Sequence, residues 1–204
     1  MAMTNDPSPL KYDETSLAKN LHDLPWSRRV IFASSCAERL MPTYHWLCLN
    51  SHSNDYEIVR EALDAIWNID SEVKRPTSLK ITTLRVKLET LVALESDEGD
   101  AIGSAVAENA IAAVAYALRT WETDEPQESI WAARQIYEAA DTIVQQSAPN
   151  QTYLNDIQSE APVQLALQGI ETALRDAQRA SVEDSIVRAK EDGKEFLTAV
   201  RDLI

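Results

Sequence analysis

Apolar residues recur through most of this 204-residue chain at alternating spacings of three and four, the repeat that gives an α-helix one apolar face. Such runs predict helices at 16–21, 26–40, 43–50, 54–69, 81–91, 100–121 and 126–146, and a helical pair over 162–204. No segment shows the sustained alternation of a half-buried strand. The pattern therefore predicts an all-α fold.

Two positions predict where helices are interrupted. Pro42 disfavours the helical conformation at the residue before it, so we expect the first long helix to end near Leu40. The apolar seam shifts by one residue at Ser181, where Ser181 and Asp184 have the form of a helix cap. The C-terminal pair is thus either two helices or one bent helix.

The Ala-rich segment 100–121 is apolar nearly all round, because only Ser104, Glu108 and Asn109 interrupt it between residues 101 and 118. Several helices can pack against such a segment, so we expect it to be the central helix of a single-domain bundle of about seven or eight helices. A membrane span is not expected, because two polar residues lie at its middle.

The domain organisation follows from the same pattern. Residues 1–15 are polar and contain Pro7 and Pro9, which predicts a flexible N-terminal tail. Residues 16–204 are predicted to form a single all-helical domain.

The net charge of −14 excludes several kinds of partner. Residues 95–204 carry 21 Asp and Glu but only 8 Lys and Arg, so nearly all the excess lies there. Nucleic acid and anionic membranes require a basic surface, and neither is expected to bind. A basic protein would be attracted, although an acidic surface also serves solubility alone.

Three features predict a cytoplasmic protein. The first residues lack a basic and apolar leader, and no uncharged apolar stretch reaches the roughly 18 residues of a membrane span. Cys36 and Cys48 lie in apolar helical patterns, so we expect free buried thiols in a reducing compartment.

Glu38 and Arg39 are the main candidates for chemistry. A carboxylate in the last turn of a helix costs about 0.3–1 kcal/mol unless it is compensated, so Glu38 should have a partner. The pair lies opposite the apolar seam but beside Ile31 and Phe32, which predicts that it is partly buried. It is either a structural lock between helices or a perturbed acid in a site. The full candidate cluster, as ligand site or structural network, is Glu38, Arg39, Tyr44, Asp64, Glu108 and Asn109.

Known catalytic and metal motifs are missing from the sequence. It contains no GxSxG, CxxC, HExxH or paired ExxH, and only three histidines. His45, Cys48 and His52 would span two helical turns, about 10 Å, which is too far for one zinc ion. We therefore expect no metal and no cofactor, nominate no catalytic residue, and lean away from an enzyme. The only basic concentration, Lys74, Arg75, Lys80, Arg85 and Lys87, is expected to face acidic helices or solvent.

A specific set of residues then carries a family resemblance. In order and spacing these are Phe32, Glu38-Arg39, Pro42-x-Tyr44, Cys48, Asp55 and the ALDxIW run at 62–67. They resemble the YjaG-like family of small bacterial proteins, catalogued as domain of unknown function 416, most firmly over residues 26–69. Thr43 stands where the family usually has Asn, and Ala37 where it usually has Cys. The resemblance implies an all-helical bacterial cytosolic protein and supplies no catalytic residue, substrate or cofactor.

Two classes of function remain. The first is a non-enzymatic protein that acts through protein–protein contact, either by self-association or as an immunity-type or adaptor protein that binds a basic partner. The second is a small-ligand binder or enzyme with an interhelical pocket around Glu38, Arg39 and Tyr44.

Overall fold

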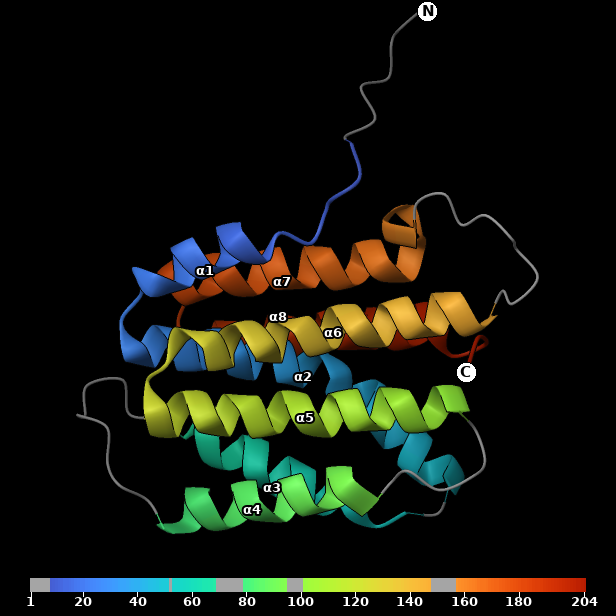
Figure 1. The fold of residues 1–204 in the computed structure, drawn as a ribbon, viewed down its shortest axis with the longest axis horizontal. Coiled ribbons are helices and arrows are strands. Elements are labelled where there is room, and N and C mark those ends of the chain that lie inside the picture. Colours follow the sequence, from blue (N-terminus) through green and yellow to red (C-terminus); the bar gives the residue numbers. More distant parts are fainter. Residues whose placement is uncertain (1–7, 52, 69–78, 95–100, 148–156) are drawn as a thin grey trace, which may run out of the picture.

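The computed structural model describes residues 8–51, 53–68, 79–94, 101–147 and 157–204. This part of the chain is all-α, as predicted, with eight α-helices, one 3₁₀ turn and no strand (Figure 1). The elements are α1 (Glu14–His22), α2 (Trp26–Ser51), α3 (Asp55–Trp67), α4 (Leu79–Leu94), α5 (Ala101–Thr123), α6 (Pro126–Ser147), η1 (Ile157–Ser159), α7 (Ala161–Arg179) and α8 (Val182–Val200).

Two helices share the centre of the molecule. The Ala-rich helix α5 packs against α2, α3, α4 and α6, which fits its small side chains. However, α2 is more enclosed, because it packs against α3, α5, α6, α7 and α8 and every residue from Arg29 to Met41 is buried. The sequence predicted a bundle around the Ala-rich helix alone, although Ile31 and Phe32 already indicated a second apolar side of α2.

The predicted end of α2 near Leu40 is wrong. The helix continues through Pro42 to Ser51, and Figure 1 shows it changing direction past its middle, as helices do at proline. An interior proline costs about 3 kcal/mol in an isolated helix. Here Met41 before the proline and Thr43 and Tyr44 after it are buried, so their tertiary packing outweighs the preference of proline against helix.

The helix break at Ser181 is confirmed. The Ser181 side chain accepts a hydrogen bond from the Asp184 backbone N–H at 3.1 Å and caps α8. α7 and α8 are therefore separate helices, and an ion pair between Asp176 and Arg188 joins them at 2.8 Å.

Leu10 and Tyr12, within the predicted tail of residues 1–15, contact the helical bundle. The backbone N–H and C=O of Leu10 each form a 2.9 Å hydrogen bond with the side chain of Gln164 on α7. Tyr12 stacks on Tyr137 of α6, and α1 begins at Glu14. The part of the predicted tail before residue 8 lies outside the described residues.

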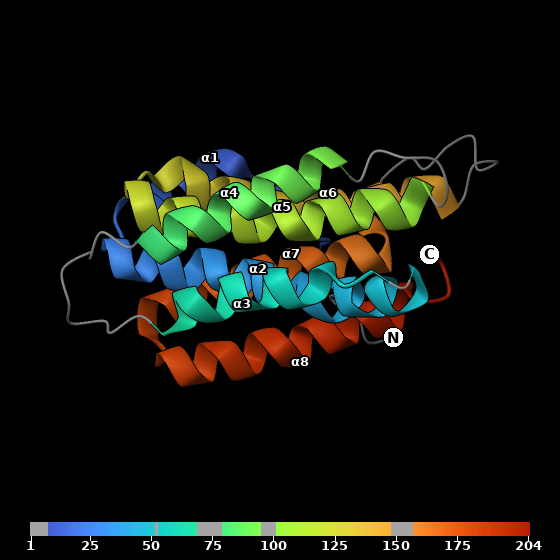
Figure 2. The ribbon, with the colours of Figure 1, turned by 90° about the horizontal axis from the view of Figure 1, so that it is seen from below.

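Among the described helices, α5 has the length and apolar composition of a membrane span. More than half of that apolar stretch is buried inside the protein, and Figure 2 shows α4 and α2 on either side of it. Core helices of soluble proteins have the same composition when they are enclosed by other helices.

Candidate functional site

The Glu38 carboxylate is buried and fully engaged by α3. Arg60 donates to its two oxygens at 2.7 and 3.0 Å, and the indole N–H of Trp67 donates at 2.9 Å. Only 2% of Glu38 is exposed. Arg60 also pairs with Asp64 one turn along α3, at 2.7 Å. The partner that Glu38 required is therefore an arginine 22 residues away.

This contact holds both charges in place. Burial alone would lower the pKa of Arg60, but its hydrogen bond to Glu38 and the charges of Glu38 and Asp64 outweigh this and raise the pKa. A two-pronged guanidinium–carboxylate contact also fixes orientation. The contact can therefore set how α3 lies on α2.

Arg39 makes the corresponding contact with α8. Its Nε and one terminal nitrogen donate to Asp192 at 3.1 and 2.7 Å, and the other terminal nitrogen donates to the Ser35 carbonyl at 2.8 Å. Two glycines allow this approach. A Cβ placed on Gly193 of α8 would lie 2.7 Å from the Arg39 carbonyl oxygen, and one on Gly169 of α7 would lie 2.9 Å from the Arg39 side chain.

The other predicted site residues do not join this cluster directly. Tyr44 is buried six residues along α2, with its ring 6.3 Å from that of Tyr56. Glu108 and Asn109 are half-buried on α5, and the Asn109 amide donates to the Ala105 carbonyl of its own helix at 2.8 Å. The structure thus unites Glu38 and Asp64 through a shared arginine, and it leaves the others apart.

Tyr44 does line a cavity of about 410 Å³ between the end of α2 and the start of α5. Trp46, Cys48 and Gly103 also line it. Glu38 and Arg39 line neither this cavity nor the larger one between α1 and α7. A pocket that combines all three candidates is not present among the cavities described.

Side chains that bind metal ions lie apart from one another in the described part of the chain. In the described ranges, no three His, Cys, Asp or Glu side chains gather closely enough to hold an ion. His45 stacks on Tyr56 with ring centres 4.1 Å apart, and His52 lies outside the described residues.

The outer side of α4 is a candidate surface that the sequence analysis missed. Leu79 is 82% exposed and Val86 is 51% exposed. Thr83 and Thr90, also exposed, donate their hydroxyl groups to backbone carbonyls of their own helix at 2.8 and 2.9 Å, so their polar atoms are already satisfied. These four residues follow spacings of four, three and four, so the sequence itself contains the pattern of this outer stripe. It is obscured by the stronger inner stripe of the same helix at Ile81, Leu84 and Leu88.

Charged residues border this stripe on the side that faces α3. Lys80 and Lys87 are exposed on α4, and Lys80 pairs with Glu61 of α3 at 3.1 Å. On the neighbouring helix α3, whose course is seen in Figure 2, Glu57, Glu61 and Asp64 are exposed. We call these two stripes together the α3–α4 face: Glu57, Glu61 and Asp64 on α3, and Leu79, Lys80, Thr83, Val86, Lys87 and Thr90 on α4.

The predicted basic concentration is divided between this face and the interior contacts of the bundle. Arg85 binds Glu122 of α5 at 2.5 Å and Glu89 at 2.8 Å, so it faces acidic residues as expected. Lys74 and Arg75 lie outside the described residues.

Comparison with known proteins places the chain in a family. The family model described as "Protein of unknown function (DUF416)" matches residues 16–187. No curated protein matches. The fold is similar to the crystal structure of a DUF416 family protein from Shewanella baltica OS155, with a TM-score of 0.69 and 16% identity over 87% of this chain and 93% of that one. Because the family model covers most of the chain, this protein belongs to the DUF416 family.

Proposed function

We propose that this protein is not an enzyme, that it acts in the cytoplasm through protein–protein contact, and that two copies of the chain meet through the α3–α4 face. The observation that carries the proposal is the arrangement of this face. An uncharged stripe bordered by Lys80 and Lys87 lies directly beside an acidic stripe. Glu38 and Arg39, in contrast, are buried and bind partners inside the same molecule, whereas the Lys80–Glu61 pair is exposed.

Such a face is complementary to itself. A two-fold axis that runs along the helices would set α4 of one copy on α3 of the other, and the same contact would be made twice. The lysines would then lie opposite Glu57, Glu61 and Asp64. Two molecules with a net charge of −14 repel each other overall, so their contact needs a local exchange of opposite charges.

The other hypotheses have less support. A pocket around Glu38, Arg39 and Tyr44 would need the first two side chains to reach a cavity, and they line neither of the two large ones. A basic partner fits the total charge, but no described surface singles out where it would bind.

Sedimentation velocity over a range of concentrations tests the proposal. Val86→Asp places a charge on the uncharged stripe, and Val187→Asp is its matched control, because both valines are about half exposed, at 51% and 54%, on different helices. We expect a dimer for the wild type and Val187→Asp, a monomer for Val86→Asp, and weaker association in high salt. A wild-type monomer at every concentration, or equal dimerisation of both variants, would contradict it.

A further inference from the structure

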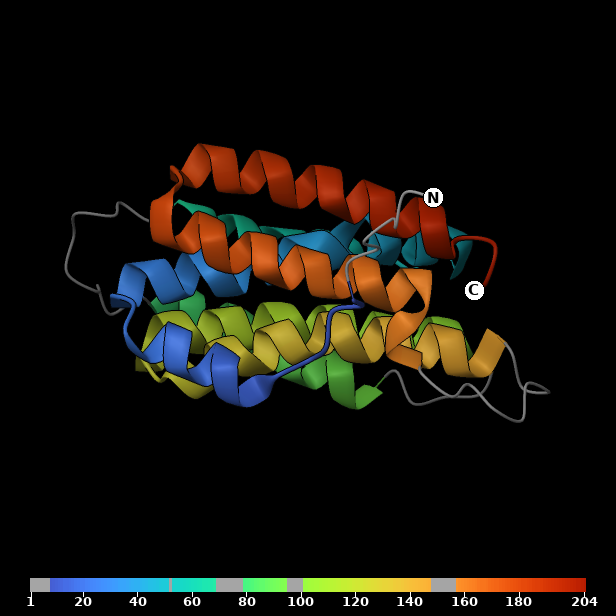
Figure 3. The ribbon, with the colours of Figure 1, turned by 90° about the horizontal axis from the view of Figure 1, so that it is seen from above.

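The larger of the two sizeable cavities described above lies on the opposite side of the molecule from α3 and α4 (Figure 1). It has a volume of about 510 Å³ and lies between the Leu10–Asp13 segment, α1 and α7. Figure 3 shows the course of these elements. This volume falls within the range of about 300–1,000 Å³ that is typical of small-molecule sites. The cavity is separate from the α3–α4 face, so it does not depend on the proposed function.

The floor of this cavity is apolar. Leu17 of α1 and Leu167 and Ile170 of α7 are buried at its base, and Leu10 and Leu174 are half-buried beside them. These side chains extend along α7 toward the Arg175 end. The twelve residue steps from Leu167 to Arg179 span about 18 Å of helix, which is long enough for a medium-length acyl chain.

The rim of the cavity carries cations without partners. Arg175 and Arg179 lie one turn apart on α7 and form no side-chain hydrogen bond or ion pair with any residue in the described ranges. Every other arginine in the described ranges donates to a carboxylate or a carbonyl oxygen. The chain has 33 acidic and only 19 basic residues. Two arginines without a carboxylate or carbonyl partner at one cavity are therefore unusual in this protein.

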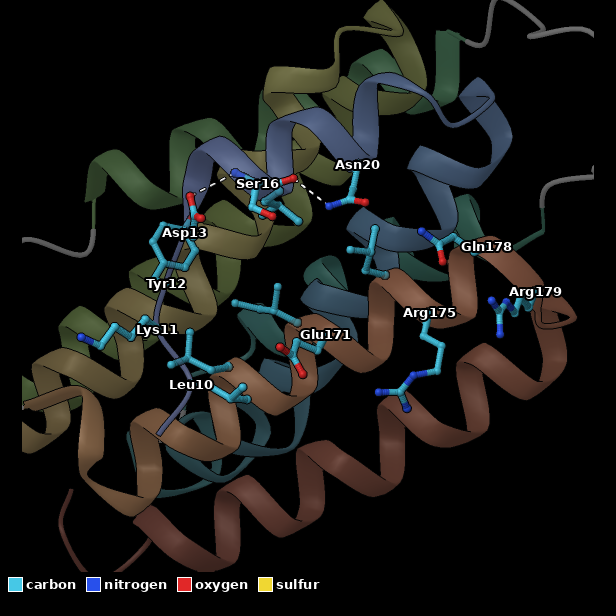
Figure 4. A pocket seen from close by; sticks show the side chains of 14 residues that line it. Leu10, Lys11, Tyr12, Asp13, Ser16, Asn20, Glu171, Arg175, Gln178 and Arg179 are labelled. Carbon is cyan, nitrogen blue, oxygen red and sulfur yellow. Dashed lines mark hydrogen bonds between the residues drawn. The ribbon is translucent and has the colours of Figure 1, made fainter. Parts of the chain in front are cut away.

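The remaining charged residues at the cavity do not neutralise this pair. Asp13 accepts a hydrogen bond from the Ser16 backbone N–H at 3.0 Å and caps α1. Glu171 lines the cavity one turn before Arg175 without forming an ion pair with it, and Lys11 adds a cation near Leu10. Figure 4 shows the Arg175 side chain extending away from α1, so its charge lies at the rim and not over the floor.

We propose that this cavity binds a single-chain amphiphile with an anionic head, of the class of a medium-chain carboxylate. The head would pair with Arg175 and Arg179 at the rim, where a guanidinium matches a carboxylate in shape and charge. The apolar chain would lie along Leu174 and Ile170 toward Leu10. The ordering of residues 10–13 against α7 would increase when the chain binds, because Leu10 would cover it.

Isothermal titration calorimetry with dodecanoate, below its micelle concentration, tests the proposal. We expect Arg175→Glu/Arg179→Glu to weaken binding at least tenfold. Lys190→Glu/Lys194→Glu is the matched control, because these lysines are exposed one turn apart on α8, line neither large cavity, and change the net charge equally. This control should bind dodecanoate as the wild type does. Circular dichroism melting should show both variants folded, since all four side chains are exposed.

Further measurements distinguish binding at this cavity from nonspecific binding of the amphiphile elsewhere on the protein. Leu174→Asn should weaken binding by removing part of the floor, whereas Val86→Asp on the α3–α4 face should leave it unchanged. Dodecyltrimethylammonium, a cation with the same chain, should bind at least tenfold more weakly than dodecanoate. No binding of dodecanoate to the wild type, equal binding of the cation, or equal losses in the arginine and lysine variants would each overturn the proposal.

Discussion

Glu38 and Arg39 are consecutive residues of α2 that bind helices on different sides of it: Glu38 accepts from Arg60 of α3, and Arg39 donates to Asp192 of α8. Neighbouring positions on a helix point about 100° apart, so one dipeptide can reach two neighbours. At this point along its length, α2 is therefore bound to both α3 and α8.

Gly193→Ala should destabilise the protein, although alanine favours helices by about 1 kcal/mol over glycine. Its Cβ would lie 2.7 Å from the Arg39 carbonyl, and a backbone atom cannot turn aside. We expect a net loss of about 1–3 kcal/mol in the free energy of unfolding, measured by urea denaturation. Gly169→Ala should cost less, because it meets an arginine side chain that can shift. Equal effects of the two variants would show that α8 can move away from α2 freely.

The two cysteines should differ in reactivity. Burial raises the pKa of the Cys36 thiol to about 12, so almost no thiolate forms at pH 8. Cys48 is also buried but lines the 410 Å³ cavity. In an assay with Ellman's reagent, we expect Cys48 to react first and Cys36 only as the protein unfolds. Cys48→Ser should remove the faster phase. A rapid reaction that remains in native Cys48→Ser protein would refute this order.

Glu89 should make stability depend on acid pH. Burial acts to raise its pKa, but hydrogen bonds from Arg119 and Arg85 outweigh this and lower the pKa below its usual 4.5. A lowered pKa stabilises the folded state above the unfolded-state value, and this stabilisation is lost as the pH falls below about 4.5. Glu89→Gln should therefore cost about 1 kcal/mol or less at pH 7 and flatten the fall in urea midpoint between pH 5 and pH 3. Parallel pH curves for the two proteins would contradict this.

The sequence predicted the helices and the burial of the Glu38–Arg39 pair because both depend on local periodicity. It did not predict the partners, since Arg60 lies 22 residues away and Asp192 lies 153 residues away. A helical wheel shows which side a residue occupies, and the neighbour on that side depends on the tertiary fold. Trp67 belonged to the family pattern, yet its hydrogen bond to Glu38 was not foreseen.

Two errors have the same physical origin. Pro42 predicts a helix end because a proline inside a helix is unfavourable. The burial of the residues before and after it outweighs that cost. The outer stripe at Leu79 and Val86 was overlooked because one apolar face suffices to define a helix. In both cases the local pattern describes one face of a helix and does not define what lies on its other faces.

The central claim is that the Glu38 carboxylate serves the fold and is not a ligand site. The most direct test is the free energy of unfolding of Glu38→Gln, with Asp64→Asn as the control, because both carboxylates bind Arg60 but Asp64 has a 58% exposed side chain. Removing one partner of a buried pair should cost about 3–5 kcal/mol, whereas the exposed partner should cost about 1 kcal/mol or less. An unchanged or increased free energy of unfolding for Glu38→Gln would contradict the account. That result is expected if Glu38 is kept for binding a ligand at the expense of stability.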